Sequence, residues 1–214
     1  MDEAPERRPI ESRNTRWARA VAKWLVESSV TPNQISQLSV VFAALASLFY
    51  WLSIGTDNWG TVAFFLLAAL CVQMRLVCNL LDGMVAIEGG KSTPDGPFWN
   101  EAPDRFADIL ILSAVGYAAG EVVLGWAACA FAVLAAYVRE LGRAEGAPNN
   151  FCGPMAKPHR MAAITVGTVG TVIAVIIGGG LAFLKIALWV VALGSFLTAL
   201  RRCYALVKYL RARG

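Results

Sequence analysis

The chain has 214 residues, of which 57% are hydrophobic and only 16% are charged, and its mean hydropathy is +0.55. This composition excludes an ordinary soluble domain, and a net charge of +4 gives no reason to expect nucleic acid as a partner, because the basic residues stand at the ends of apolar runs. The five cysteines lack CxxC spacing and indicate small buried thiols rather than a metal or redox motif.

The N-terminal 1–30 segment predicts a polar tail followed by an amphipathic helix on the membrane surface. Residues 14–28 place aromatic and aliphatic side chains such as Trp17 among basic ones such as Lys23. Apolar and basic faces on one helix are typical of a helix that lies in the membrane interface. We therefore expect a cytoplasmic tail and surface helix first, and a membrane domain over residues 31–214.

Six apolar runs, each about 20 residues long, predict membrane-spanning helices, because that length of helix crosses about 30 Å of hydrocarbon. The expected fold is an all-α integral membrane protein with six transmembrane helices after the surface helix. The expected spans are residues 35–54, 60–87, 102–120, 122–143, 160–178 and 181–207.

The distribution of basic residues predicts the orientation of these spans. Six crossings place both termini on one side, and Arg139, Lys157 and Arg201 fall on the same side as the basic N-terminal segment. The connections on the opposite side contain no Lys or Arg. Because cytoplasmic loops are enriched in basic residues, we expect the termini and the two longer loops to be cytoplasmic.

A group of polar residues at the cytoplasmic ends of the second and third spans predicts a functional site. Asn79 and Asp82 are three residues apart, and Asp104 and Asp108 are four apart, so each pair shares a helical face. Two antiparallel helices can bring these faces together. Carboxylate and amide oxygens suit Mg²⁺, Mn²⁺ or Ca²⁺. Capping of the third helix by its two aspartates is the alternative, but it explains neither the spacing nor Asp82.

These residues carry a resemblance to a known family. The sequence reads Asn79-Leu-Leu-Asp82-Gly83-Met-Val-Ala86 and then Asn100-Glu-Ala-Pro-Asp104-Arg-Phe-Ala-Asp108. This pattern resembles the signature of the CDP-alcohol phosphotransferase family, D-x2-D-G-x2-A-R followed after a spacer by G-x3-D-x3-D. Thr31-Pro32-Asn33-Gln34-Ile35-Ser36, before the first span, is similar to a segment that family members often carry there.

The resemblance implies a site with two divalent ions, Mg²⁺ or Mn²⁺, where CDP-diacylglycerol or a similar CDP-lipid binds and CMP leaves. Asp82 and Asp104 would be metal ligands, Asn79 a weaker one, and Asp108 both a ligand and the catalytic base. The residues expected to contact the CDP-lipid are Asn33, Gly83, Ala86 and Lys91. The resemblance also implies a homodimer, surrounded by membrane lipids, in a bacterial inner (plasma) membrane.

A second cluster suggests where the acceptor alcohol binds. Arg139 ends the fourth span, and Lys157, His159 and Arg160 lead into the fifth. Basic side chains there suit a phosphate on the acceptor, as in the branch of the family that makes phosphatidylinositol phosphate. Branches that use glycerol phosphate have a similar basic pair. The alternative is that these residues only set the orientation of the spans.

Three positions depart from the family signature. Asn79 replaces its first Asp, Ile87 its Arg, and Asn100 its Gly, while Lys91 lies nearby in the loop and offers a substitute for the missing arginine.

The sequence thus predicts a transferase of phospholipid biosynthesis that moves a phosphatidyl group onto a small alcohol or alcohol phosphate. A catalytically degenerate relative that binds CDP-lipid or metal is the alternative, and an ion transporter ranks last because the acids lie away from the bilayer midplane.

Overall fold

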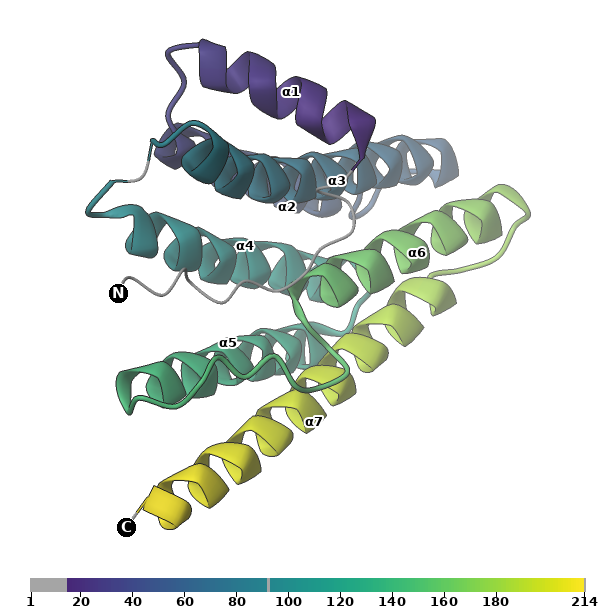
Figure 1. Ribbon diagram of the computed structural model, residues 1–214. Coiled ribbons are helices and arrows are strands. Elements are labelled where there is room, and N and C mark those ends of the chain that lie inside the picture. Colours follow the sequence, from purple (N-terminus) through teal and green to yellow (C-terminus); the bar gives the residue numbers. More distant parts are fainter. Residues whose placement is uncertain (1–14, 92, 214) are drawn as a thin grey trace.

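The computed structural model describes residues 15–91 and 93–213, which form helices and no strand. One short helix, α1 (Arg16–Glu27), precedes six longer ones (Figure 1). The longer helices are α2 (Pro32–Leu52), α3 (Asn58–Glu88), α4 (Gly96–Ala118), α5 (Val122–Ala144), α6 (Lys157–Ile176) and α7 (Ala182–Arg213). The all-α fold is therefore confirmed.

Within the described residues, five helices are long and apolar enough to cross a membrane: α2, α3, α5, α6 and α7. Five of the six expected spans are thus present as helices whose length and composition suit a membrane protein. The helix α4 is not among the five, although it has 23 residues. Its first half carries the charged residues Glu101, Asp104, Arg105 and Asp108, which lower its apolar character.

Local sequence explains how the helices at the acidic end begin. Thr31 caps α2, since its hydroxyl accepts a hydrogen bond from the Gln34 backbone N–H at 3.3 Å and the Gln34 side chain accepts one from the Thr31 N–H at 2.9 Å. The helix α4 begins at Gly96, earlier than the expected residue 102, and continues through Pro103. Proline has no N–H to donate to the preceding turn, yet the helix is continuous through this residue.

The helices pack around α2. Both α3 and α4, which bear the acids, pack extensively on it. The remaining contacts run from α4 to α5, from α5 to α7, and from α7 through α6 back to α3. The acidic ends of α3 and α4 therefore face a common space that α2 alone does not fill.

The short helix α1 lies on α3 (Figure 1). Its two buried residues, Ala18 and Ala22, are fully covered, and their lack of bulk lets the helices approach closely. Trp17 and Trp24 lie on other faces of α1 and are 48% and 66% exposed. A helix is thus present where the surface helix is expected, and it leaves large apolar side chains uncovered.

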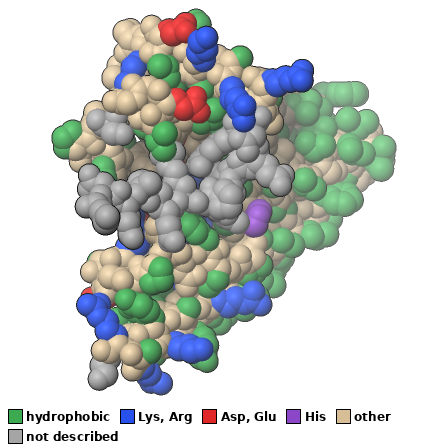
Figure 2. Space-filling view, in the orientation of Figure 1, with side chains coloured by type: hydrophobic (Ala, Val, Ile, Leu, Met, Phe, Trp, Pro, Cys, Tyr) green, Lys and Arg blue, Asp and Glu red, His purple; other side chains and the backbone are tan. Residues whose placement is uncertain are grey.

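The surface of the molecule separates apolar from basic residues. Hydrophobic side chains cover the end of the molecule at the right of Figure 2, whereas Lys and Arg side chains lie toward the other end and over its centre. Helices α2, α6 and α7 expose large aliphatic and aromatic residues such as Val41, Val166 and Trp189. Such exposed apolar surface is expected for side chains that contact lipid.

The contact between α4 and α5 gives a testable prediction. A Cβ atom added at Gly125 would lie 2.8 Å from the Cα of Gly116 and 3.0 Å from the Leu112 carbonyl oxygen, so the two helix backbones must separate to admit it. We expect Gly125→Ala to destabilise the protein by about 1–3 kcal/mol, seen as a lower thermal unfolding midpoint in detergent. Gly142→Ala, on the same helix, is the control, because its Cβ would meet no atom closer than 3.6 Å. Equal midpoints for the two variants would contradict this account.

Candidate functional site

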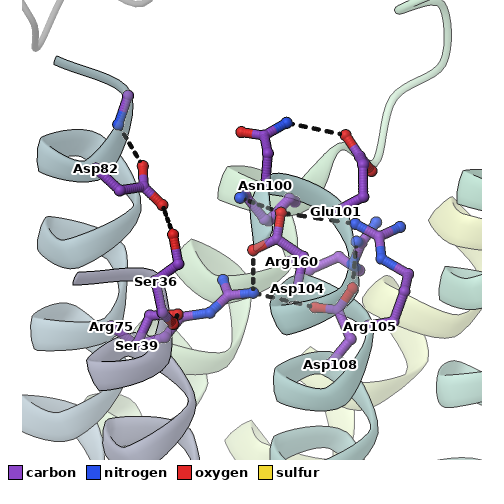
Figure 3. A network of polar contacts seen from close by, with 12 residues as sticks. Ser36, Ser39, Arg75, Asp82, Asn100, Glu101, Asp104, Arg105, Asp108 and Arg160 are labelled. Atoms are coloured by element: carbon purple, nitrogen blue, oxygen red, sulfur yellow. Dashed lines mark hydrogen bonds and ion pairs between the residues drawn. The ribbon is translucent and has the colours of Figure 1, made fainter. Parts of the chain in front are cut away.

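Asp82 lies near the C-terminal end of α3 and points toward the space shared with α4 (Figure 3). The residue is only 7% exposed. One carboxylate oxygen accepts a hydrogen bond from the Ser36 hydroxyl of α2 at 2.7 Å, and the other accepts one from the Gly83 backbone N–H at 2.5 Å. The side chain is therefore held by neutral donors, and it keeps its negative charge available for a cation.

Asp104 and Asp108 lie one turn apart on α4 and are 5% and 0% exposed. Arg75, which comes from α3 and is fully buried, joins them: its NH2 atom lies 3.3 Å from Asp104 Oδ1 and 3.9 Å from Asp108 Oδ1. An unpaired buried carboxylate costs several kcal/mol, so this arginine offsets the burial of both acids.

Two basic residues of α6 complete the ion pairs. Lys157 Nζ binds Asp104 Oδ2, and Arg160 NH2 lies 2.5 Å from Asp108 Oδ2. The guanidinium of Arg160 also donates to the Met155 carbonyl oxygen at 3.2 Å. The expected acceptor-binding residues of α6 therefore contact the expected metal ligands of α4 directly.

A cleft of about 160 Å³ opens beside these pairs. Asp104, Lys157 and Arg160 line it together with Arg139 of α5. Arg139 donates to Glu101 at 2.5 Å and to Glu140 at 2.9 Å. The structure thus brings three of the four expected acceptor residues to one cleft. The fourth, His159, is exposed outside it, with Nδ1 2.9 Å from the Pro154 carbonyl oxygen.

Sequence reasoning missed two arginines of the cleft, Arg105 and Arg202. Arg202 of α7 is 7% exposed and donates to the carbonyl oxygens of Cys152, at 3.1 Å, and Ala135, at 2.7 Å. It forms no ion pair with a carboxylate in the described part of the chain, and it is repelled by Arg139 and other arginines. The adjacent arginines Arg201 and Arg202 could have indicated an anion site, but they were interpreted only as residues that set the orientation of the membrane spans.

The residues expected to bind the CDP-lipid lie around the ends of α2 and α3. Asn33 donates to the Asp95 carboxylate at 3.2 Å, and hydrogen bonds from Thr93, Trp99 and Asn33 hold the pKa of Asp95 below its ordinary value. Lys91 Nζ donates to the Ser28 carbonyl oxygen at 2.7 Å and so ties the loop after α3 to the end of α1.

Gly83 and Ala86 are half-buried on the last turns of α3, beside Asp82. Asn100, at a position where the signature has glycine, is exposed on the first turns of α4 and donates to Glu101 at 3.3 Å. These small and polar side chains surround the acidic group without forming part of its ion pairs.

The chemistry of the donors fits a divalent metal ion. Asp82, Asp104 and Asp108 supply hard oxygens, and Asp108 Oδ1 is buried without a hydrogen-bond partner among the described residues. Asn79 is half-buried on the same helix as Asp82, and its buried Nδ2 likewise has no described partner. No group of three His, Cys, Asp or Glu residues within 15–91 and 93–213 is gathered tightly enough to hold an ion as it stands. A metal would instead compete with Lys157 and Arg75 for the Asp104 oxygens.

No family model matches the chain. Among curated proteins, it is 30% identical over 152 residues to the bifunctional IPC transferase and DIPP synthase of Rubrobacter xylanophilus, over 67% of this chain but only 32% of that protein. It is 26% identical over 204 residues to the phosphatidylinositol phosphate synthase of Mycolicibacterium smegmatis, which covers 88% of this chain and 82% of that protein. The chain therefore spans about a third of the first relative and about four fifths of the second.

Solved structures share the fold. Phosphatidylinositol phosphate synthase of Mycobacterium tuberculosis with CDP-DAG bound has a TM-score of 0.72 at 18% identity, covering 90% of this chain and 94% of that one. The same enzyme in complex with manganese and citrate also has a TM-score of 0.72 at 18% identity, with 88% of each chain covered. The chain thus shares the fold of a helical membrane phosphatidyltransferase. Its sequence is similar to those of enzymes of the CDP-alcohol phosphotransferase family, whose signature its residues resemble.

The buried arginine of the site gives a prediction. Arg75→Met removes the cation that both buried aspartates of α4 share, and we expect a loss of about 3–5 kcal/mol in stability, measured as a fall in the thermal unfolding midpoint in detergent. Arg105→Gln is the control: its NH2 lies 3.7 Å from Asp104 and its side chain is 21% exposed, so its loss should change the midpoint little. A midpoint for Arg75→Met equal to that of the unmodified protein would show that Arg75 does not offset the burial of the acids.

Proposed function

We propose that the protein transfers a phosphatidyl or similar phospho-alcohol group from a CDP-linked lipid to a small alcohol that carries a phosphate, with release of CMP. The observation that carries this proposal is the shared wall at Asp104, which belongs both to the acidic group and to the cleft lined by basic residues. The M. tuberculosis enzyme of the same fold binds CDP-DAG in one structure and manganese in another, which supports a CDP-lipid donor and a divalent metal.

Different residues of the site would carry out different parts of the reaction. Asp82, Asp104 and Asp108, with Asn79, would hold Mg²⁺ or Mn²⁺, which neutralises charge on the pyrophosphate when bound. Asp108 Oδ1, which accepts no hydrogen bond from the described residues, would accept the proton of the attacking hydroxyl. The hydroxyl oxygen forms a bond to the lipid-bearing phosphorus, the pyrophosphate bond breaks, and CMP leaves with the bridging oxygen.

The acceptor phosphate would bind in the basic cleft. Arg139, Lys157 and Arg160 line it, as the sequence led us to expect, and Arg202 adds a guanidinium that no described carboxylate neutralises. A buried cation without a counter-charge favours an anionic ligand, and guanidinium groups bind phosphate through paired hydrogen bonds. His159 remains a minor candidate because it lies outside the cleft. These contacts favour an alcohol phosphate over a neutral alcohol such as inositol or glycerol.

The donor would bind from the membrane beside the acidic group. Asn33, Gly83, Ala86 and Lys91 surround the ends of α2 and α3 and are our proposed contacts to the CDP-lipid. The hydrogen bonds that Asn33 and Lys91 make to neighbouring loop residues would position the ends of α2 and α3 and would not themselves contact the pyrophosphate. The substitution of Ile87 for the signature arginine removes a charge there, and Ile87 is 52% exposed.

We also propose how the molecule lies in the membrane. With α4 as the sixth span, α1 on the membrane surface and the basic residues on the cytoplasmic side, both termini and the site face the cytoplasm of a bacterial cell. The charged residues of α4 gather in its first half, where they would lie near the interface rather than at the bilayer centre. The N-terminal segment 1–30 would be a peripheral region and residues 31–214 the membrane domain, which we propose assembles as a homodimer. The polar tail expected before residue 15 lies outside the described residues.

The transfer reaction is tested by CMP release. Purified protein in detergent, given CDP-diacylglycerol and Mn²⁺, should release CMP only with an alcohol phosphate such as inositol phosphate or glycerol 3-phosphate, and Asp108→Asn should reduce the rate by at least about 100-fold. Glu121→Gln is the matched control, since Glu121 pairs with Lys185 at the opposite end of the helices and should leave the rate unchanged. Binding of CDP-lipid without CMP release with any acceptor would instead support the degenerate relative that binds but does not react.

The role of Arg202 is tested separately. Arg202→Gln should raise the KM for the alcohol phosphate by about 10- to 100-fold, the loss expected for one charged hydrogen-bonding group, and leave the KM for CDP-lipid nearly unchanged. Arg201→Gln removes the neighbouring but exposed guanidinium and should leave both constants unchanged. Equal effects of the two substitutions would contradict a specific contact between Arg202 and the acceptor phosphate.

A further inference from the structure

We infer that Lys157 couples metal binding to acceptor binding by exchanging one anionic partner for another. This inference rests on the proposed function and concerns the order in which its ligands bind. In the structure the Lys157 ammonium is ion-paired to Asp104 Oδ2, an oxygen of a proposed metal ligand. The same side chain lines the cleft proposed for the acceptor phosphate. Lys157 therefore belongs to both sites.

Lys157 is the most exposed of the cations that pair with the acidic group, and Arg105, the next most exposed at 21%, lies farther from Asp104, at 3.7 Å. Arg75 is fully buried, and Arg160 is 4% exposed and fixed at two points, to Asp108 and to the Met155 carbonyl oxygen. The Lys157 side chain is 27% exposed, stands at the first residue of α6, and has Asp104 as its one hydrogen-bond partner within the described residues. A lysine ammonium on a flexible stem is also easier to redirect than a guanidinium held at several atoms.

The charges of the metal ion and of the acceptor phosphate explain why their binding would drive Lys157 from one partner to the other. Lys157 is ion-paired to Asp104 of α4 and also interacts electrostatically with Asp82 of α3. A divalent ion on these carboxylates repels the ammonium and takes its place on Asp104. The nearest other position for the ammonium is the cleft that it already lines, where an acceptor phosphate supplies a new anion.

Thermodynamic linkage makes this exchange reciprocal. If metal releases Lys157 toward the phosphate, then the phosphate must strengthen metal binding by the same factor. Coupling of this kind typically amounts to about 5- to 150-fold in affinity. The two sites would then fill cooperatively, and a protein that has bound only the acceptor or only the metal would be the less populated species.

The test measures Mn²⁺ affinity by calorimetry on the purified protein in detergent, with no acceptor, with saturating inositol phosphate or glycerol 3-phosphate, and with inositol or glycerol. Blank titrations correct for Mn²⁺ that the phosphates bind in solution. We expect the phosphates to tighten Mn²⁺ binding on the order of 10-fold and the neutral alcohols to have no effect. Lys157→Gln should bind Mn²⁺ more tightly than the unmodified protein without acceptor, because a competing cation is gone, and should lose the coupling.

Arg139→Gln is the matched variant, since Arg139 lines the same cleft but pairs with Glu101 rather than with Asp104. It should weaken acceptor binding while leaving Mn²⁺ affinity without acceptor unchanged and the coupling factor intact. A Lys157→Gln protein that retains the coupling, or that binds Mn²⁺ more weakly, would overturn the inference and leave the proposed reaction standing. Absence of Mn²⁺ binding to the unmodified protein would overturn the proposed function together with it.

Discussion

The architecture depends on the cost of burying negative charge at the ends of membrane helices. Asp82, Asp104 and Asp108 are each at most 7% exposed, and such carboxylates are stable only where cations or donors reach them. Arg75 and Arg160 reach them from α3 and α6, so the ion pairs fix how both helices stand relative to α4. Because the three carboxylates are stabilised by nearby positive charge, they are also suited to bind a divalent ion.

The helix α2 is the support on which the two halves of the acidic group are placed. Both α3 and α4 pack on it, and its Ser36 hydroxyl holds Asp82 at 2.7 Å. The basic cleft adjoins the same acids of α4, and α5, α6 and α7 each contribute arginine or lysine to it. Asp104 therefore stands where the acidic group and the basic cleft meet, and a transfer between two substrates requires such adjacent sites.

The sequence predicted the helices and much of the site because hydropathy and helical spacing are local properties. Helical spacing places Asp104 and Asp108 on one face of a helix. Spacing and the loops between helices also bring together Arg139, Lys157 and Arg160. Arg202 was missed because the apolar residues around it cover every face of α7, so the sequence does not show which face is buried. The packing of both acid-bearing helices on α2 was not predicted, because the sequence does not show which helices share a long contact.

The close approach of Gly116 and Gly125 lies at the end of the α4–α5 pair that is remote from the cleft, next to the turn that connects the two helices. At the other end the helices are joined by the pair between Glu101 and Arg139, whose side chains remain 28% and 18% exposed. The α4–α5 pair is therefore held at one end by close contact between backbones, and at the end that borders the cleft by an ion pair between partly exposed side chains. The second contact is open to competition from a charged ligand, whereas the first is not.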